Sequence, residues 1–567
     1  MAFAVLYAAL ERGSVTRTSA TFDEPGGLLA GYAALAERDY RPAVEHPPLL
    51  RMWTALPLLW LPDVAWNGAA IDRAAPADVA FPGPFGIGQH FLYVRNDADR
   101  LLYAGRSMTT VIGVALGVVL FCWMLEWLGF RAAVIALALY TVEPNLAAHA
   151  GLVTNDLGVT AFMFASVYFL WRLGRGGQWT WNAAGLVACV AAAVLSKFSA
   201  ILLAPMLLVL MALSIRRRQT LTMRSSLGLI GLMIAVIWIG AWAAYGFRYE
   251  PSATPGWRFA LQDLPAVRQA VPTLAAIVDR VDAWQVLPNA FTQGFLHGQG
   301  LVQARPAFLA GQYSSTGWWY YFPAAFAMKT PIALLLLFGA GLLMAARRRG
   351  LAPGGVAFVV VPIVVFGGLA MTSSLNIGLR HILPIYPFVI MLAAMAAEWP
   401  IDALGSRRGT GTVAVLLVLA AAEFGRAYPS SLSFFNAAVG GPSRGYAYLA
   451  DSNIDWGQDL KPLKAWMDRQ GVDHINLAYF GVADPAYYRM NYTPIWGTTL
   501  PNLAPGQIGP PKLPGYVAVS VTLLNGVPFP ARERDFYKPL RDREPAADIG
   551  GSSRGYWVET PGWPARP

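Results

Sequence analysis

The sequence predicts a mainly α-helical protein that crosses a membrane many times and carries a small C-terminal α/β domain. Of its 567 residues, 56% are hydrophobic and only 13% are charged, whereas soluble domains carry about 25% charged residues. Apolar runs of roughly 16–21 residues recur along the chain, close to the ~20 residues that cross ~30 Å of hydrocarbon. The net charge of +10 does not indicate nucleic-acid binding, because the arginines cluster in short loops between these runs.

About eleven membrane-spanning helices are expected. Apolar runs lie near residues 108–128, 132–149, 156–173, 181–196, 198–214, 226–246, 331–346, 355–371, 383–398 and 411–427. The segment from Met1 to Leu10 is apolar but too short to span a membrane, so we interpret it as the end of a truncated first helix. It lacks a basic region and a small-residue cleavage site, so no cleavable signal peptide is predicted.

The arginines orient these helices. If the spans alternate, one side of the membrane holds every arginine cluster: Arg172 and Arg175; Arg216, Arg217, Arg218 and Arg224; Arg347, Arg348 and Arg349; Arg407 and Arg408. The positive-inside rule makes that side cytoplasmic. We therefore expect a transmembrane domain at 1–427 with long outer loops at 11–107 and 247–330. An extracytoplasmic domain follows at 428–567, in a multi-pass protein of the cell inner (plasma) membrane.

The C-terminal segment has the pattern of a small α/β domain. Leu460, Leu463 and Met467 recur at helical spacing within residues 456–470, and Gly471 is a natural helix stop. Segments 475–480 and 515–523 are rich in β-forming residues and are bounded by Gly and Pro, which predicts strands.

Acidic residues mark two places on the outer side. Asp23 and Glu24 are adjacent in Thr21-Phe22-Asp23-Glu24-Pro25, where they suit a base, a metal ligand or the partner of a cation. A helix cap is the alternative for Asp23. Asp156 opens a helix, and its charge suits the positive end of the helix dipole. Capping alone would explain it, although an ionisable residue at membrane depth is a functional candidate.

Cations also lie on the outer side, against the topological bias. Lys197 sits between two apolar runs, and Arg380 and His381 precede a late helix. Arginine favours phosphate recognition through its fork of donors, so these residues suggest a bound anionic group; a snorkelling side chain is the alternative for Lys197. His46 precedes two prolines that hold its backbone rigidly, either for a binding site or for a turn into an interfacial helix at 49–61.

Two further motifs stand out. Trp318 and Tyr320 belong to the run Gly317-Trp318-Trp319-Tyr320-Tyr321-Phe322-Pro323, which fits an interfacial aromatic belt or a stacking surface for a sugar ring. The run Asp451-Ser452-Asn453-Ile454-Asp455-Trp456 has oxygen ligands at alternate positions, as calcium requires, but Trp456 stands where an EF-hand needs glycine. Helix capping and docking of the domain to the membrane are the alternatives. Metal dependence is open, with a divalent cation as one candidate cofactor.

Taken in order, these motifs resemble the polyprenyl-phosphate-dependent glycosyltransferases of the GT-C fold. The protein O-mannosyltransferases and the lipid A aminoarabinose transferases are their best-known branches. The segments that carry the resemblance are Phe-Asp-Glu, His-Pro-Pro-Leu, Gly-Trp-Trp-Tyr-Tyr-Phe-Pro, Arg-His-Ile-Leu-Pro-Ile-Tyr-Pro and Asp-Ser-Asn-Ile-Asp-Trp-Gly-Gln-Asp-Leu. They look similar to a bacterial branch of phospholipid-carrier-dependent glycosyltransferases and span most of residues 20–470.

The resemblance implies an inverting glycosyltransferase that moves a sugar from a polyprenyl-phosphate donor to an acceptor hydroxyl on the periplasmic or outer face. The implied catalytic residues are Asp23, Glu24 and Asp156. The implied substrate-binding residues are His46, Lys197, Arg380, His381, Trp318 and Tyr320. The partners would be the lipid-linked donor, a lipid, glycan or protein acceptor, and membrane lipids, with no nucleic acid.

Two other classes of protein are alternatives. A membrane transporter or flippase for a lipid-linked substrate would place buried charges near the midplane, in halves related by internal symmetry. The sequence shows charges at one membrane surface and no repeated halves. A non-catalytic assembly or sensor protein would leave the matching of outer acids with outer cations unexplained.

Overall fold

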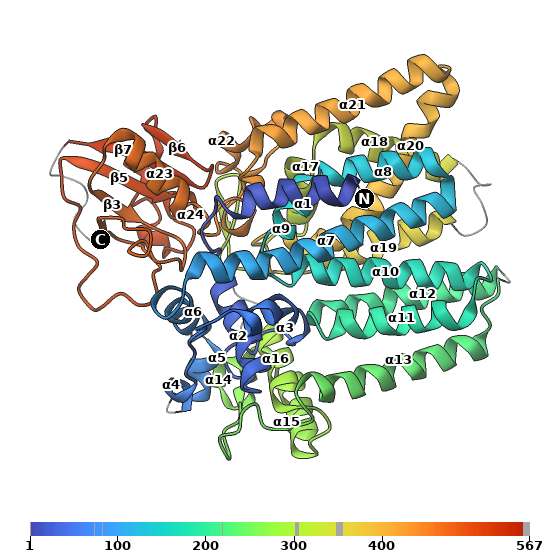
Figure 1. Ribbon diagram of the computed structural model, residues 1–567, viewed down its shortest axis with the longest axis horizontal. Coiled ribbons are helices and arrows are strands. Elements are labelled where there is room, and N and C mark those ends of the chain that lie inside the picture. Colours follow the sequence, from blue (N-terminus) through green and yellow to red (C-terminus); the bar gives the residue numbers. More distant parts are fainter. Residues whose placement is uncertain are drawn as a thin grey trace.

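The structure is a computed structural model that describes residues 2–72, 74–81, 83–217, 219–300, 305–347 and 355–559. Most of this chain is helical, and a bundle of long helices forms its body (Figure 1). The bundle helices are α1 (Ala2–Val15), α7 (Ala98–Leu128), α8 (Phe130–Thr141), α10 (Asp156–Gly174), α11 (Trp179–Val194), α12 (Leu203–Arg216), α13 (Met223–Ala244), α18 (Ile332–Arg347), α19 (Gly355–Ala370), α20 (Tyr386–Ala403) and α21 (Ser406–Ala427). Together they are consistent with the expected number of spans.

The exposed apolar surface of these helices indicates that lipid surrounds them. Within the described ranges, six helices are long and apolar enough to cross a membrane, and four shorter ones are also apolar. In the most apolar window of the span Leu379–Ile401, which includes most of α20, 89% of the residues are buried, whereas in α13 the share is 17% and in α21 it is 22%. An apolar helix that exposes most of its surface needs a lipid environment. The chain is therefore a multi-pass membrane protein, with α20 at the centre of the bundle.

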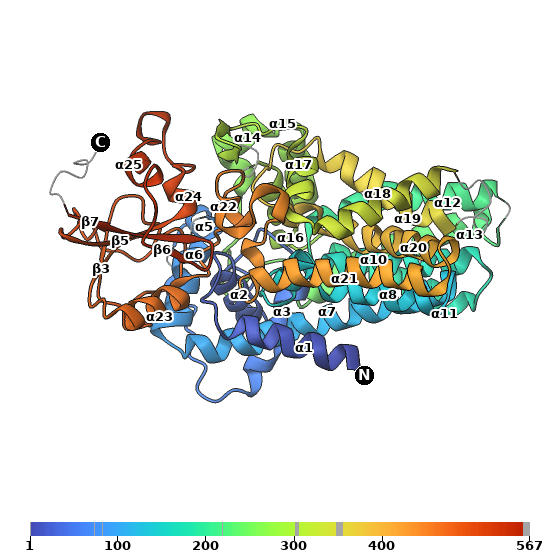
Figure 2. The same cartoon turned by 90° about the horizontal axis from the view of Figure 1, so that it is seen from above.

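The helices alternate in direction as the arginine pattern predicts. The turns between α10 and α11, between α12 and α13, and between α20 and α21 lie at one end of the bundle, and the C-terminal sheet lies at the other (Figures 1 and 2). The first end holds the described members of the arginine clusters; Arg218, Arg348 and Arg349 lie outside the described residues. The opposite end, which carries the sheet, is called the outer end below.

Two predicted boundaries differ from the structure. Helix α7 begins at Ala98 rather than near residue 108, because the carboxylate of Asp97 accepts the Arg100 amide at 3.1 Å and caps a polar first turn. The run 132–149 is two helices, since α8 ends at Thr141 and Pro144 opens the short helix α9 (Pro144–Ala150). His149 is thereby moved out of the membrane helix to the outer end.

The two long outer loops fold over the outer end of the bundle. The first forms α2 (Glu24–Ala36), α3 (Leu49–Ala55), η1 (Leu56–Trp60), α4 (Ala69–Asp72), α5 (Pro76–Ala80), α6 (Gly83–Gln89) and η2 (His90–Val94). The second forms η4 (Leu261–Asp263), α14 (Pro265–Ala270), α15 (Pro272–Ala283), α16 (Asn289–Gly300), the hairpin β1 (Ala307–Leu309)–β2 (Gln312–Ser314), and α17 (Tyr321–Lys329). The interfacial helix expected at 49–61 corresponds to α3 and η1. Short helices η3 (Phe198–Leu202) and η5 (Leu379–Ile385) lead into α12 and α20.

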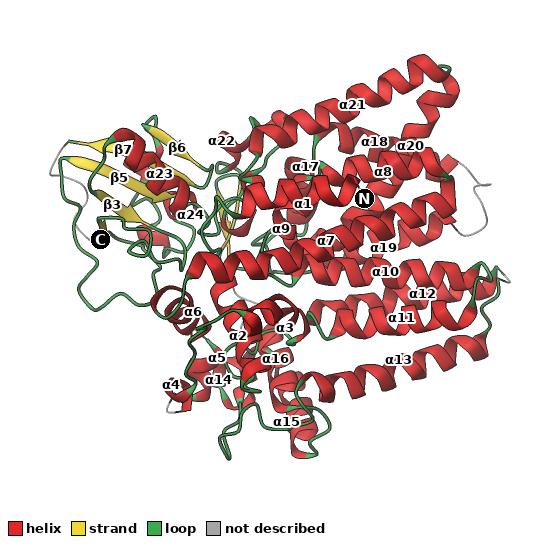
Figure 3. Ribbon diagram, viewed as in Figure 1, coloured by secondary structure: helices red, strands yellow, loops and turns green. Residues whose placement is uncertain are grey.

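The C-terminal α/β domain contains a five-stranded sheet in the order β4-β3-β5-β7-β6 (Figure 3). Strand β3 pairs in parallel with β4 and β5, whereas β7 pairs antiparallel with β5 and β6. The strands are β3 (Ile475–Ala478), β4 (Tyr492–Pro494), β5 (Gly515–Ser520), β6 (Ala547–Ile549) and β7 (Ser553–Val558). The short helices are η6 (Ser431–Ser433), η7 (Ala437–Val439), α22 (Pro442–Gly445), η8 (Asp451–Asn453), α24 (Val521–Leu524), η9 (Ala531–Glu533) and α25 (Lys538–Arg541).

The predicted helix and strands of this domain are present with shorter bounds. Helix α23 (Leu460–Gln470) buries Leu460, Leu463 and Met467 and ends at Gly471, whose φ of 66° is the left-handed conformation that suits glycine. It begins at Leu460 rather than at 456, because residues 456–459 make contacts with other parts of the chain, described below. The strand expected at 515–523 ends at Ser520, where α24 begins.

Candidate functional site

Asp156 lies between two cations at the outer end of the bundle. It is the first residue of α10, and its carboxylate Oδ1 is 2.5 Å from Nζ of Lys197, which lies between α11 and η3. Its Oδ2 is 3.6 Å from Nη1 of Arg380, in η5. Only 2% of the Asp156 side chain is exposed. A buried carboxylate needs such partners, because removing its charge from water costs several kcal/mol.

Arg380 joins this ion pair to the first outer loop and to the C-terminal domain. Its Nη1 donates to Oδ2 of Asp23 at 3.0 Å, and its Nε donates to Oγ of Ser452 at 3.2 Å. The guanidinium carbon lies 4.1 Å from the ring centroid of Trp456, a stacking arrangement that suits the flat guanidinium. Among the described residues, Nη2 has no hydrogen-bond partner. The charged network of Asp23, Asp156, Lys197 and Arg380 therefore has free donors on its cations.

Asp23 differs from the other three members of the charged network in its exposure. It immediately precedes α2, but its side chain makes no capping hydrogen bond. Its carboxylate faces Arg380 while 42% of the side chain stays exposed, against 13% for Arg380. The helix-cap alternative therefore does not describe Asp23, and its carboxylate is open to a second molecule.

Glu24, the next residue, is fully enclosed. Its two carboxylate oxygens accept from Nε and Nη2 of Arg106 on α7, at 2.8 and 2.6 Å. The same oxygens accept the backbone amides of Thr21 and Val153, at 2.7 and 2.9 Å. Burial alone would raise the pKa of Glu24, but the Arg106 guanidinium and these amides hold it below its usual range. Glu24 thus ties the first outer loop to α7 and to the loop before α10.

Three histidines, each with a buried ring nitrogen, surround the charged network: His46 in the first outer loop, His149 in α9 and His381 in η5. Each has one ring nitrogen with no hydrogen-bond partner among the described residues: Nδ1 of His46, Nδ1 of His149 and Nε2 of His381. Burial, followed by the charges of Lys197 and Arg51, lowers the pKa of His46. Burial lowers the pKa of His149 to about 4. His46 and His149 are therefore neutral near pH 7.

His46 is held by its neighbours Glu45 and Arg51. Arg51 forms an ion pair with Glu45 and donates from Nη1 to the carbonyl oxygens of Ala43 and His46, at 2.8 and 3.2 Å. The two prolines after His46 lead into α3. The rigid presentation that the prolines predict thus also depends on Arg51, which is 5% exposed.

The aromatic run divides into two parts. Tyr321 is buried in α17, and its hydroxyl accepts from Nδ2 of Asn453 at 2.8 Å. The ring of Phe322 lies 6.5 Å from the imidazole of His381. Trp318 is half-buried, and its amide donates to Asn376, while Tyr320 is 39% exposed. In the described structure, no contact joins the side chains of Trp318 or Tyr320 to the charged network.

Residues 451–459 bind the C-terminal domain to the outer end of the bundle. Asn453 accepts the amide of Leu379 at 2.9 Å, next to Arg380 in η5. Asp455 accepts the amide of Thr522 at 3.0 Å, and Asp459 accepts from the hydroxyl of Ser552 at 2.6 Å. Each acidic side chain thus has its own protein partner. The docking alternative describes this motif better than a calcium loop.

Burial changes the acidity of this motif. It raises the pKa of Asp455 to about 8 and that of Asp459 to about 7, in spite of their hydrogen bonds. One carboxyl oxygen of each has no hydrogen-bond partner among the described residues. These carboxyls are therefore largely protonated at pH 6.

Lys329 closes the same junction from α17. Lys329 is 2% exposed. Its ammonium donates to the carbonyl oxygens of Leu432 and Phe434, both at 3.0 Å, and to that of Asn453. Burial lowers the pKa of Lys329 to about 7. The three carbonyls hold the start of the C-terminal domain against α17.

The structure places four further residues at the charged network that sequence reasoning had not assigned to the donor site: Asp451, Ser452, Trp456 and His149. Asp451 has a φ of 55°, a conformation that aspartate tolerates better than most residues. Its side chain interacts electrostatically with Arg380, Arg305 and Asp23, and burial raises its pKa to about 6. The density of polar residues at 451–459 was the available signal, but spacing alone does not reveal which of them face Arg380.

The residues present do not fit a metal site. In the part of the chain that the structure describes, no three His, Cys, Asp or Glu side chains converge as metal ligands do. The carboxylates of Asp23 and Asp156 face Arg380 and Lys197 instead.

The chain is similar to several solved structures. No curated protein matches the chain. Among solved structures, ArnT from Cupriavidus metallidurans bound to undecaprenyl phosphate is similar at 13% identity, over 98% of this chain and 97% of that chain, with a TM-score of 0.46. The apo oligosaccharyltransferase from Archaeoglobus fulgidus is similar at 13% identity, over 76% of this chain and 57% of that chain, with a TM-score of 0.40.

The family comparison covers the helices that carry part of the charged network. Residues 98–243 match the family model described as dolichyl-phosphate-mannose-protein mannosyltransferase. This stretch runs from the start of α7 to the end of α13 and includes Asp156 and Lys197. The match confirms the resemblance to lipid-phosphate-dependent glycosyltransferases over these residues: from α7 to α13, the chain is similar to the dolichyl-phosphate-mannose-protein mannosyltransferase family.

Proposed function

We propose that this protein is an inverting glycosyltransferase that moves a sugar from a polyprenyl-phosphate donor to an acceptor hydroxyl. The observation that carries the proposal is the charged network of Asp23, Asp156, Lys197 and Arg380. Its members come from the first outer loop, α10, the α11–η3 turn and η5, and they meet where the membrane helices end. A polyprenyl-phosphate sugar requires this arrangement, since its lipid lies in the bilayer and its phosphate lies at the surface.

The cations of the charged network bind the donor phosphate. Lys197 uses one of its three donors on Asp156, and Arg380 keeps Nη2 free among the described residues. These free donors can reach an added phosphate oxygen. As the bond from the anomeric carbon to the phosphate oxygen breaks, the electron pair leaves with the phosphate. Lys197 and Arg380 then stabilise the added charge.

Asp23 is the base for the acceptor. Its partly exposed carboxylate takes the proton of the acceptor hydroxyl while that oxygen attacks the anomeric carbon. One displacement of this kind inverts the anomeric centre. Asp156, almost fully buried, positions Lys197 and Arg380. We assign Glu24 a structural role because all of its oxygens are engaged by Arg106 and backbone amides.

The neutral histidines and the aromatic run complete the donor side. His46 and His381 offer unpartnered ring nitrogens to hydroxyl or phosphate oxygens. Trp318 and Tyr320 stay candidates for covering the sugar, from the head of α17. The steps above depend on the chain's own cations, Lys197 and Arg380.

The arginine pattern and the arrangement of the helices support a site on the outer face of the membrane. The arginine-rich turns lie at the end of the bundle opposite the charged network, and the positive-inside rule makes that end cytoplasmic. We therefore place the active site on the periplasmic face of the inner (plasma) membrane. The membrane-embedded domain then comprises residues 1–427, and the described part of the outer domain comprises 428–559.

Binding and turnover of the purified full chain test this function. We expect undecaprenyl phosphate to bind the detergent-solubilised protein, and Lys197→Met to weaken that binding at least tenfold, since a hydrogen bond to a charged group contributes ~1.5–3 kcal/mol. We also expect transfer from a polyprenyl-phosphate sugar with inversion at the anomeric carbon, read by NMR. Absence of lipid-phosphate binding would overturn the proposal. A transporter would bind the lipid but form no product in detergent, where no second compartment exists.

A further inference from the structure

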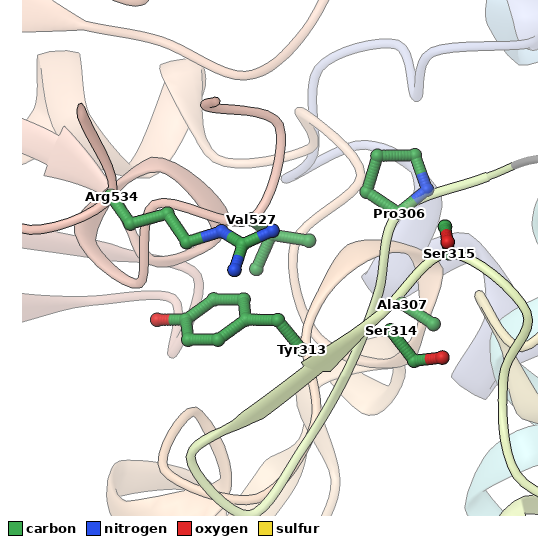
Figure 4. A pocket seen from close by; sticks show the side chains of 7 residues that line it. All are labelled: Pro306, Ala307, Tyr313, Ser314, Ser315, Val527 and Arg534. Carbon is green, nitrogen blue, oxygen red and sulfur yellow. The ribbon is translucent and has the colours of Figure 1, made fainter. Parts of the chain in front are cut away.

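A pocket of about 400 Å³ opens between the hairpin β1–β2 and the C-terminal domain. Its volume falls within the ~300–1,000 Å³ of typical small-molecule sites. It is lined by Pro306, Ala307, Tyr313, Ser314, Ser315, Val527 and Arg534 (Figure 4). No residue of the charged network is among them, so this pocket is distinct from the donor site.

Arg534 is the charged group of this pocket. Its side chain extends from the C-terminal domain over the ring of Tyr313 (Figure 4), with the guanidinium carbon 4.4 Å from the ring centroid. Within the described ranges, it forms no ion pair, and its buried Nε has no hydrogen-bond partner. The Tyr313 hydroxyl is engaged elsewhere, since it donates to the carbonyl of Asn525 at 2.6 Å. Tyr313 therefore contacts the guanidinium only through its ring. A guanidinium held flat by a ring, with its donors free, is suited to binding an anion.

The pocket is connected to the charged network through one short segment of the C-terminal domain. Tyr313 and Val527 pack with Phe308 and Ala450 in one apolar cluster, and Ala450 is bonded directly to Asp451. Asp451 in turn interacts electrostatically with Asp23 and Arg380. The pocket and the charged network are therefore linked through the consecutive residues Ala450 and Asp451. The hairpin keeps this position because Ala310 donates to the carbonyl of Tyr448 at 2.8 Å.

We propose that this pocket is an acceptor subsite in which Arg534 binds an anionic group, a phosphate or carboxylate, carried by a sugar acceptor. That the bound molecule is a sugar acceptor rests on the proposed function. That the pocket binds an anion does not. The ring of Tyr313 and the Val527 side chain supply the apolar wall, and Arg534 supplies the charge. An acceptor held here by its anion would extend toward the charged network, which this pocket joins through Ala450 and Asp451.

Titration of the full chain with glucose 6-phosphate, with glucose as the uncharged control, tests the subsite. Saturating undecaprenyl phosphate is added first, so that Lys197 and Arg380 are occupied. We expect glucose 6-phosphate to bind the native protein and Arg534→Gln to weaken it at least about tenfold, as loss of a charge-assisted hydrogen bond implies. Arg534→Lys should recover part of the affinity. Arg532→Gln is the matched control, since this neighbour is 84% exposed and points to Glu533.

Three results would overturn the proposal: glucose binding as tightly as glucose 6-phosphate, equal affinity of the native protein and Arg534→Gln, or loss of affinity in Arg532→Gln as well. Thermal unfolding of Arg534→Gln shows whether the arginine only clamps the hairpin. If unfolding shifts while affinity is unchanged, the role is structural and the subsite is wrong. If undecaprenyl phosphate itself does not bind, the proposed function fails, and the same titration without lipid still tests the pocket.

Discussion

Nη1 of Arg380 lies 3.0 Å from Oδ2 of Asp23, although 357 positions separate these residues in the chain. The same nitrogen is 3.6 Å from Asp156. One guanidinium thus connects the exposed acid that we assign to the acceptor with the buried acid that we assign to the donor side. Variants that uncouple these two acids give the most direct predictions.

Asp23→Asn should reduce the rate of glycosyl transfer by about 100-fold or more, because general-base catalysis contributes ~10²–10⁴-fold. The affinity for undecaprenyl phosphate should stay within about threefold, since Lys197 and Arg380 remain. Transfer assays and lipid binding on the same preparation separate the two effects. Full activity in this variant would rule out Asp23 as the base.

Glu24→Gln should behave differently from its neighbour. It leaves Arg106 buried without a charge partner, which typically costs ~3–5 kcal/mol of folding free energy. We therefore expect a marked loss of thermal stability, or loss of the folded protein. Asp23→Asn is the matched control: that side chain is 42% exposed, so its stability should change by less than about 1 kcal/mol. Equal stability of the two variants would contradict the structural role of Glu24.

Lys197 and Asp156 should be coupled in a double-mutant cycle. Lys197→Met alone leaves the Asp156 carboxylate, which is 2% exposed, with Arg380 only, and should lower the melting temperature. Asp156→Asn with Lys197→Met removes the unpaired charge and should recover stability. It should not recover lipid-phosphate affinity, because the ammonium is absent. Recovery of both properties would show that Lys197 serves only the ion pair.

Trp456→Leu should weaken lipid-phosphate binding by about three- to tenfold. The indole supports the Arg380 guanidinium at 4.1 Å, and such cation–π contacts contribute ~0.5–2 kcal/mol. Trp456→Phe should retain most of the affinity because it keeps an aromatic face. Equal affinities of the leucine and phenylalanine variants would mean that stacking does not hold Arg380.

The stability of the C-terminal domain should fall as pH rises. Burial raises the pKa of Asp455 to about 8 and of Asp459 to about 7, whereas an unfolded aspartate titrates near ~3.9. Between these values the folded state binds more protons than the unfolded state, so the free energy of unfolding decreases from pH 5 to pH 9. Thermal unfolding followed by tryptophan fluorescence measures this slope.

Substitution identifies the source of that slope. Asp455→Asn combined with Asp459→Asn should flatten the pH dependence of unfolding. Asp535→Asn, at a side chain that is 70% exposed, should leave it unchanged. An unaltered slope in the double variant would assign the pH dependence to other groups.

The helices, their order and the end of the bundle at which each connection lies could be predicted from the sequence, because each depends on local composition. A run of apolar residues partitions into lipid wherever it occurs, and an arginine cluster stays on the cytoplasmic side. The two boundary errors in the membrane helices, at Ala98 and at Val142–Glu143, arose where polar caps and a proline changed the helix ends. The strands of the C-terminal domain were visible for the same local reason.

The site could be predicted only in part. Acids and cations on the outer side suggested a lipid phosphate, and the structure brings Asp23, Asp156, Lys197 and Arg380 together. The sequence alone determined which residue types lie at which end of the helix bundle. Only the tertiary structure decided that Asp23 faces Arg380 while Glu24 is enclosed by Arg106, and that Trp456 supports Arg380. The physical reason is that the energy of a charge depends on its distance to a partner and on its access to water. Neither quantity can be calculated from spacing along the chain.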